Sequence, residues 1–201
     1  MDQVKIEQLV KEIIEQIGED GTREGLKETP RRVAKSFEKL FGGYKMNAEE
    51  MVTEFDGENY DEMIICKNID FFSNCEHHMQ PFFGTVHIGY IPDKKIIGIS
   101  KLPRLVEIYA RRLQNQERLT MQIAEKLSEI LKPKGVGVVI QAKHLCMMAR
   151  GVEKQNTTMI TSSCRGLFKT NQLTRSEFLK LIEGFSGSTI TIPSLTTSFN
   201  K

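Results

Sequence analysis

The chain has 201 residues, 39% hydrophobic and 27% charged, which suits one globular domain with an N-terminal elaboration. Its formal net charge of +2 is too small to indicate a nucleic-acid or membrane partner, and no apolar run approaches the roughly 20 residues that span a bilayer. The first residues lack the apolar segment of a signal peptide, so we expect a cytoplasmic protein. In that reducing compartment we expect some of the four cysteines to serve metal binding or catalysis rather than disulfides.

Two amphipathic helices are predicted in the N-terminal helical region, residues 1–60. Apolar side chains recur at intervals of three and four between residues 2 and 17, which is the period of a helix with one buried face. Thr29 and Pro30 predict the start of the second helix, because Thr is a good cap and Pro suits the first turn. Gly42 and Gly43 predict its end.

The main domain, residues 61–183, is predicted from alternating strand and helix patterns. This order favours an α+β fold in which two helices pack on one face of an antiparallel sheet. Residues 184–201, rich in Ser and Thr, form a C-terminal tail to which the sequence assigns no role. Strands are expected at 63–72, 82–91, 96–99 (a short return strand), 136–147 and 157–163, and helices at 100–113, at 117–131 after a sharp turn over 114–118, and from a Thr174 cap onward.

The densest group of metal-ligating side chains is Cys75-Glu76-His77-His78, which follows a predicted strand and precedes Pro81. That position indicates a turn. The three-residue spacing of Cys75 and His78 lets both side chains converge in one tight loop.

A second group, His144-Leu145-Cys146, falls near the end of the strand predicted at 136–147. Side chains at positions i and i+2 of a strand point to the same face. We therefore expect His144 and Cys146 to project together, while Leu145 points away.

Thiolate and imidazole groups are ligands that zinc takes in tetrahedral geometry. Cys75, His78 and Cys146 would supply three ligands and leave one position for water, as in catalytic sites. His77 and His144 would then be unbound imidazoles that carry protons beside a water of lowered pKa, which describes a hydrolytic centre. A closed structural site with His77 or His144 as fourth ligand is also compatible with the spacing.

The remaining histidine and cysteines are interpreted as structural. His87 lies in the middle of a predicted strand, and Cys66 and Cys164 are expected in or near the core.

Ser100, Lys101 and Arg104 open the helix predicted at 100–113. Free backbone N–H groups and the helix dipole favour phosphate at a helix start, and Arg150 is a candidate for the same pocket. An exposed basic helix start is the simpler interpretation of this pattern alone.

Gln116 and Glu117 lie at the turn between the two helices of the main domain. A carboxylate can accept two hydrogen bonds from guanine, one from N1–H and one from the exocyclic amine. A Gln-Glu pair at a helix start is nevertheless more often a cap or a surface pair. These residues by themselves name no substrate.

Taken together, the motifs of this chain resemble those of the GTP cyclohydrolase I family. The resemblance covers about residues 5–183 in the right order and does not extend to the tail. The matching stretches are 22–26 (TREGL), 28–34 (ETPRRVA), 75–78 (CEHH) with Pro81-Phe82, 86–92 (VHIGYIP), 98–102 (GISKL), 116–120 (QERLT), 144–147 (HLCM) and 150–152 (RGV).

The resemblance implies the tunnelling fold, in which sheets of several subunits complete a barrel with helices outside. It also implies a homo-oligomer, a decamer of two stacked pentameric rings with active sites at subunit boundaries and one Zn²⁺ per subunit. The implied reaction converts GTP and water to formate and 7,8-dihydroneopterin triphosphate, the first step of tetrahydrofolate or tetrahydrobiopterin synthesis.

The resemblance also implies roles for the two histidine-containing motifs. Cys75, His78 and Cys146 match the zinc ligands, and zinc-activated water would attack C8 of the guanine. His144 matches the histidine that supports ring opening by proton transfer at N7. His77 matches the one near the ribose ring oxygen, which serves the later rearrangement of the sugar.

Substrate contacts carry over from the other matching motifs. Glu117, with Gln116, resembles the guanine-recognition pair. The clustered Lys and Arg side chains would bind the negative charges of the triphosphate. The polar ribose and triphosphate contacts of the family are matched here by Ser100, Lys101, Arg104 and Arg150.

Two residues depart from the family pattern. Leu113 and Asn115 stand where the family often has Pro and Val, in the inter-helix turn. We expect neither change to touch a matched catalytic residue.

Two other functions are compatible with the sequence. One is a tunnelling-fold relative that keeps the metal site and acts on another purine or pterin, against which Gln116, Glu117 and Arg150 argue. The other is a non-enzymatic interaction protein stabilised by a closed zinc site.

Overall fold

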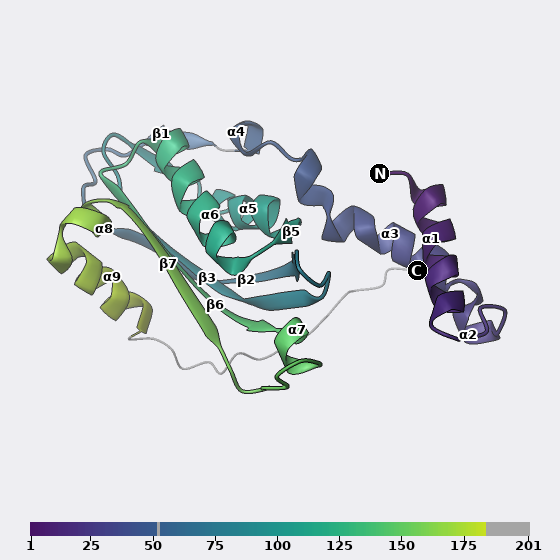
Figure 1. Ribbon diagram of the computed structural model, residues 1–201. Helices are drawn as coiled ribbons and strands as arrows, with labels where there is room; N and C mark the ends of the chain where they lie inside the picture. Colours follow the sequence, from purple (N-terminus) through teal and green to yellow (C-terminus); the bar gives the residue numbers. More distant parts are fainter. Residues whose placement is uncertain (52, 184–201) are drawn as a thin grey trace.

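The N-terminal helices α1 and α3 pack on each other and project away from the sheet in the computed structural model, which describes residues 1–51 and 53–183 (Figure 1). The side chain of Asp2 caps α1 by accepting a hydrogen bond from the Lys5 amide. Ile14 is the buried residue of α1. The predicted helix 2–17 is confirmed. The helical elements of this region are α1 (Gln3–Gln16), α2 (Glu24–Lys27), α3 (Thr29–Leu40), the 3₁₀ helix η1 (Gly42–Lys45) and α4 (Ala48–Met51).

The start of α3 differs from the prediction by one residue. Glu28 holds the cap position and Thr29 is the first helical residue, with its hydroxyl donating back to Gly25 O at 3.4 Å. The reason is α2, which brings the chain to Glu28 already close to helical backbone angles. Thr29 therefore has no extended backbone from which to cap.

A five-stranded sheet in the order β5-β2-β3-β6-β7 forms the centre of the molecule (Figure 1). Its pairs are antiparallel except for the parallel pair β2–β5. The predicted antiparallel sheet is confirmed. β5 was not predicted, because a strand of two residues is too short to show a periodic pattern. The strands are β2 (Ile64–Cys75), β3 (Pro81–Ile91), β5 (Leu113–Gln114), β6 (Gly135–His144) and β7 (Met159–Gly166).

The strand predicted at 96–99 does not return along the central sheet. It is β4 (Lys95–Ile97), and it pairs with β1 (Glu54–Asp56) in a separate two-stranded sheet. β1 lies within the region predicted as helical. An ion pair between Lys95 on β4 and Glu54 on β1 joins residues that are 41 positions apart in the sequence. A local pattern of side chains therefore could not reveal this pairing of strands.

Two helices cover one face of the sheet, as predicted: α5 (Lys101–Ala110) contacts β2, and α6 (Gln116–Leu131) contacts β6 and β7. Apolar side chains fill the space between them and the sheet, among them Phe82, Val86, Leu105, Leu119 and Ile123. On the opposite face, α8 (Leu167–Thr170) and α9 (Gln172–Glu183) cover a second, smaller cluster with Val139, Phe168, Phe178 and Ile182.

Two predicted caps are not made by the expected side chains. Ser100 holds the cap position of α5 but makes no capping hydrogen bond. At α9 the cap is Asn171 rather than Thr174, because Asn171 Oδ1 accepts from the amides of Leu173 and Thr174. The tail predicted at 184–201 lies outside the described residues. Within the described ranges, no helix is long and apolar enough to cross a membrane.

His87 is a structural residue of β3, as predicted. It is buried, and its Nδ1 accepts a hydrogen bond of 3.3 Å from the amide of Asn68, which lies in a bulge of β2 between Cys66 and Ile69. Burial lowers the pKa of His87, and the charge of Lys67 lowers it further. A protonated imidazole would lose the bond to Asn68, because both its nitrogens would be donors.

The pH dependence of stability tests this role of His87. Because the pKa of His87 is lower in the folded state, the unfolded chain binds the proton more tightly. Stability from this residue is therefore present above about pH 6.5 and lost as the pH falls through the folded-state pKa. We expect urea unfolding between pH 7.5 and 5 to show a smaller loss of stability in His87→Gln, whose amide oxygen accepts from Asn68 at every pH. Equal losses in both proteins would contradict this prediction.

Candidate metal centre

The turn between β2 and β3 carries two of the predicted ligands. The Cys75 amide donates to Gln80 O at 2.8 Å, and Cys75 O accepts from the amides of His78 and Met79 at 3.3 and 2.7 Å. Met79 takes a left-handed backbone, with φ of +54°, to close the turn. These bonds bring the Cys75 Sγ and His78 Nδ1 atoms to 3.6 Å from one another.

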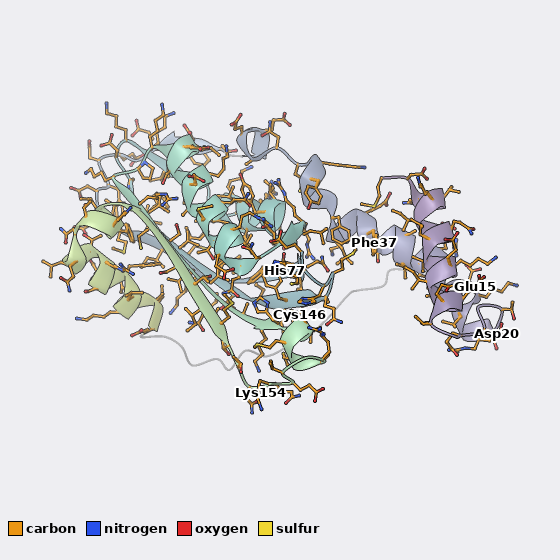
Figure 2. The ribbon with its side chains drawn as sticks, viewed as in Figure 1. Glu15, Asp20, Phe37, His77, Cys146 and Lys154 are labelled. Carbon is orange, nitrogen blue, oxygen red and sulfur yellow. The ribbon has the colours of Figure 1, made fainter. Side chains whose placement is uncertain are left out.

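The third predicted ligand comes from a one-turn helix rather than from a strand. β6 ends at His144, and Cys146 lies in α7 (Leu145–Met148). The expectation that His144 and Cys146 share one strand face is therefore wrong, because the backbone turns helical after His144. Figure 2 shows His77 and Cys146 at the same end of the sheet.

Sheet register explains why distant parts of the sequence meet here. β3 begins just after the Cys75 turn, β6 ends just before Cys146, and Phe82 pairs with His144 in the ladder between these strands. The turn and α7 therefore leave the same end of the sheet. The ligand atoms of Cys75, His78 and Cys146 all lie within 4.8 Å of one another.

The donor set fits a tetrahedral metal. Zinc–sulfur and zinc–nitrogen bonds of about 2.3 and 2.1 Å at a tetrahedral angle put two donors about 3.6 Å apart. The observed distance between Cys75 Sγ and His78 Nδ1 is 3.6 Å. Three ligands leave one coordination position open, and neither His77 nor His144 belongs to the group of mutually close ligand atoms in the described residues.

The surroundings of Cys146 shift the pKa of its thiol. Burial raises the pKa of Cys146, and the neighbouring Cys75 raises it further, while Arg150 opposes the shift. A divalent cation bound at this position would favour loss of the Cys146 proton, because the metal charge compensates the thiolate.

His144 lies outside the three-ligand group and is held from two sides. Its ring stacks on Phe82, with centroids 4.6 Å apart and an interplanar angle of 2°. Its Nε2 lies 2.8 Å from Gln116 Oε1. Burial lowers the pKa of His144, with an opposing effect from Glu117.

The orientation of the Gln116 amide assigns the His144 tautomer. Gln116 is 1% exposed, and its Nε2 faces three oxygens, those of Ile140 O, Met159 O and Thr161 Oγ1. Its Oε1 must then accept from His144 Nε2–H, which leaves Nδ1 as the proton-accepting atom of the neutral imidazole.

His77 projects from the same turn into solvent, with a side chain that is 65% exposed. Its Nδ1 lies 3.9 Å from Cys75 Sγ, and its Nε2 lies 3.7 Å from Glu76 Oε1. Glu76 is a residue for which the sequence indicated no role. Hydrogen bonds from Arg118 and then Asn115 hold the pKa of Glu76 below its ordinary value.

The predicted phosphate contacts come from two separate elements of the chain. Arg150 Nη1 lies 3.4 Å from His78 Nε2 and 3.3 Å from Cys146 O, so it adjoins the metal group. Ser100, Lys101 and Arg104 lie at the start of α5, whereas the end of α5 leads into β5 beside Cys75. A helix of 10 residues is about 15 Å long, which separates the two groups within the chain.

Fold and site together define an α+β protein with a three-ligand candidate metal centre and two histidines beside it. A family model described as GTP cyclohydrolase I matches residues 6–183, so the chain belongs to that family. The predictions of this family, its enzyme class and its tunnelling fold are confirmed.

Three relatives named GTP cyclohydrolase 1 are similar over nearly their whole length. The one from Leptospira biflexa serovar Patoc is 57% identical over 178 residues, which cover 88% of this chain and 97% of the relative. That of Wolinella succinogenes is 55% identical over 177 residues, covering 88% and 95%. That of Campylobacter jejuni subsp. jejuni serotype O:6 is 53% identical over 182 residues, covering 90% and 95%.

Metal content tests the three-ligand group. We expect about one equivalent of zinc per chain, and we expect Cys146→Ala to weaken binding by more than the about 10–100-fold that changes outside the ligand shell cost. Cys164→Ala is the matched control, because this half-buried thiol packs in the smaller cluster. The measurements are elemental analysis after dialysis and competition with a chromophoric chelator. Equal zinc content in the two variants would rule out Cys146 as a ligand.

Proposed function

We propose that this chain is a zinc-dependent GTP cyclohydrolase, which converts GTP and water to formate and 7,8-dihydroneopterin triphosphate at the start of tetrahydrofolate or tetrahydrobiopterin synthesis. The observation that carries the proposal is the group of two thiols and one imidazole whose ligand atoms lie within 4.8 Å of one another, beside His77 and His144. Sulfur and imidazole donors favour zinc over magnesium or calcium. The match of the family model to residues 6–183 supports the choice of reaction.

Cys75, His78 and Cys146 would hold the zinc, which when bound supplies Lewis-acid activation of water. His144 then has two separate tasks at its two nitrogens. Its Nε2–H stays on Gln116 Oε1, which fixes the ring, and its Nδ1 accepts and returns the proton as the imidazole ring of guanine opens at N7. The lowered pKa of His144 supports this role, because a neutral imidazole accepts protons.

His77 is proposed to transfer protons at the ribose during the later rearrangement of the sugar. Its exposure supports this role, because an exposed imidazole on the Cys75 turn can meet a substrate that enters from solvent. The nearby Glu76 carboxylate limits the orientations of the His77 ring, since His77 Nε2 and Glu76 Oε1 lie 3.7 Å apart.

Glu117 and Gln116 are proposed to recognise the base. Glu117 lies in the first turn of α6, and its carboxylate would accept from guanine N1–H and the exocyclic amine. In the single chain, the Gln116 side-chain amide binds His144 and the sheet. A direct contact between Gln116 and the substrate therefore remains a prediction.

Arg150 is proposed to bind the triphosphate of the substrate held at its own chain's metal group. Ser100, Lys101 and Arg104 are proposed to reach the same substrate from a neighbouring subunit. Their separation from Arg150 within one chain supports this arrangement, because a triphosphate needs several cations around it.

We also propose that the chain assembles as a homo-oligomer, a decamer of two pentameric rings. The central sheet curls and ends in β5 and β7, and unpaired strand edges invite pairing with another copy.

Formate release from GTP tests the proposed reaction. We expect zinc-loaded protein to release formate and to form a fluorescent pterin, and we expect a strong chelator to abolish both. His144→Ala should keep its zinc and lose about 10²–10⁴-fold in kcat, the usual contribution of a proton-transfer residue. His87→Gln is the control for a buried histidine away from the site. Folded, zinc-loaded protein without chelator-sensitive formate release would refute the function, and zinc loss in His144→Ala would make His144 a ligand.

Mixing two inactive variants tests whether the active site is shared between subunits. We expect Lys101→Ala and Cys146→Ala each to lack activity. Mixed oligomers of the two should regain about a quarter of wild-type activity, because random assembly places an intact Lys101 beside an intact metal group at one site in four. Absence of recovery in mixed oligomers, verified by mass spectrometry of differently tagged subunits, would place Lys101 and Cys146 of the same chain at one site.

A further inference from the structure

Glu76 stands between a proposed ligand and a proposed proton carrier, yet its side chain points toward the start of α6. Asn115 Nδ2 donates to Glu76 Oε1 at 2.8 Å, and the guanidinium of Arg118 pairs with Oε2. The Glu76 amide donates to Gln114 O at 2.9 Å. Both carboxylate oxygens and the backbone of this residue are therefore tied to the segment that leads into α6.

The two residues that hold Glu76 are themselves fixed. Asn115 caps α6, because its Oδ1 accepts from the Arg118 amide at 2.8 Å. Arg118 Nε donates to Gln114 Oε1 at 2.9 Å, and the buried Gln114 amide donates in turn to Tyr109 O and Gln122 Oε1. The contacts to Glu76 thus start from a buried anchor rather than from mobile surface side chains.

The same helical turn also reaches the other parts of the site. Gln116 holds His144, and Glu117 is the proposed base-recognition residue. The first turn of α6 therefore contacts the metal turn through Asn115 and Arg118 and the proton-transfer histidine through Gln116. One rigid element sets where the metal turn, His144 and the purine lie relative to each other.

We propose that Asn115 and Arg118 are positioning residues that act through Glu76; we call the three residues the Glu76 clamp. The clamp fixes the turn from Cys75 to His78 against α6, so that both ligands already point at the metal position before it is filled. Preorganised ligands bind metal more tightly, because less conformational freedom is lost on binding. This inference rests on the metal centre of the proposed function.

The clamp fixes the orientation of the metal turn and adds little to the folding stability of the protein. Glu76 and Arg118 side chains are 27% and 37% exposed, and ion pairs in such surroundings contribute little to folding. Two bonds to the two oxygens of one carboxylate do, however, fix both its position and its plane. A residue directly beside Cys75 transmits that orientation to the ligand through the backbone.

A swap of donor and acceptor tests the clamp. Asn115→Asp keeps the cap of α6, since its carboxylate still accepts from the Arg118 amide, but it sets a second carboxylate against Glu76. Adding Glu76→Gln restores the contact in the opposite sense: the Gln amide donates to Asp and its oxygen accepts from Arg118. Asn171→Asp, at the cap of α9, is the matched control for the same exchange away from the site.

The readouts are the absorption spectrum of cobalt-substituted protein and the rate at which excess chelator removes the metal. We expect Asn115→Asp to alter the thiolate–cobalt bands and to lose metal at least about tenfold faster than wild type, as changes around a ligand shell do. The double variant should return to within about twofold of wild type, which is the coupling expected of residues in contact. The control should match wild type.

The experiment separates failure of the clamp from failure of the metal centre. Wild-type rates and spectra in Asn115→Asp, or a double variant no better than this single variant, would overturn the clamp. Failure of wild-type protein to bind cobalt or zinc would instead overturn the metal centre of the proposed function. If Asn115→Asp does not fold, Asn115→Ser replaces it, because Ser keeps the cap but has no donor that reaches Glu76; faster metal loss then supports the clamp and unchanged loss overturns it.

Discussion

The buried side-chain amide of Gln116 is the interaction on which the geometry of the candidate site depends. It joins the first turn of α6 to the backbone of β6 and β7 and to His144. A buried amide that loses a partner costs about 1–3 kcal/mol, so the helix start can neither slide along the sheet nor rotate without a penalty. The positions of Asn115, Glu117 and Arg118, which follow from this helix start, are fixed with it.

The sheet supplies the second constraint, because its register decides which loops meet. Phe82 pairs with His144, so the turn that precedes β3 and the helix that follows β6 leave the same end of the sheet. Stacking of Phe82 on His144 continues this pairing into the site. Residues 75–78 and 146 thus meet through strand pairing, and the one-turn helix α7 only adjusts the direction of Cys146.

Long periodic elements were predictable from the sequence, whereas the pairing of the short strand β4 and the existence of most other short elements were not. α1 and α6 and the four long strands each carry enough apolar positions to show a period, and their existence is confirmed. β1, β5 and α7 have two to four residues each and are fixed by distant partners, so no local pattern reveals them. The same limit explains the error at His144 and Cys146, where a strand pattern ran on into a helical turn.

The metal group illustrates what spacing can and cannot decide. Sequence spacing selected Cys75, His78 and Cys146 but left a fourth histidine ligand open, because the number of intervening residues fixes no distance between separate segments. Coordinates narrow the choice, since His144 Nε2 is bound to Gln116 and His77 lies outside the close group. The expectation that the change at Asn115 touches no matched catalytic residue left out contacts made through a neighbour of such a residue, because Asn115 binds Glu76, which lies between Cys75 and His77. Its hydrogen bond to Glu76 spans 39 residues of sequence and exists only because β5 lies beside the end of β2. A departure from a family pattern is therefore best judged by what its side chain contacts in the fold, and here the contact leads to the turn that holds two of the three ligands.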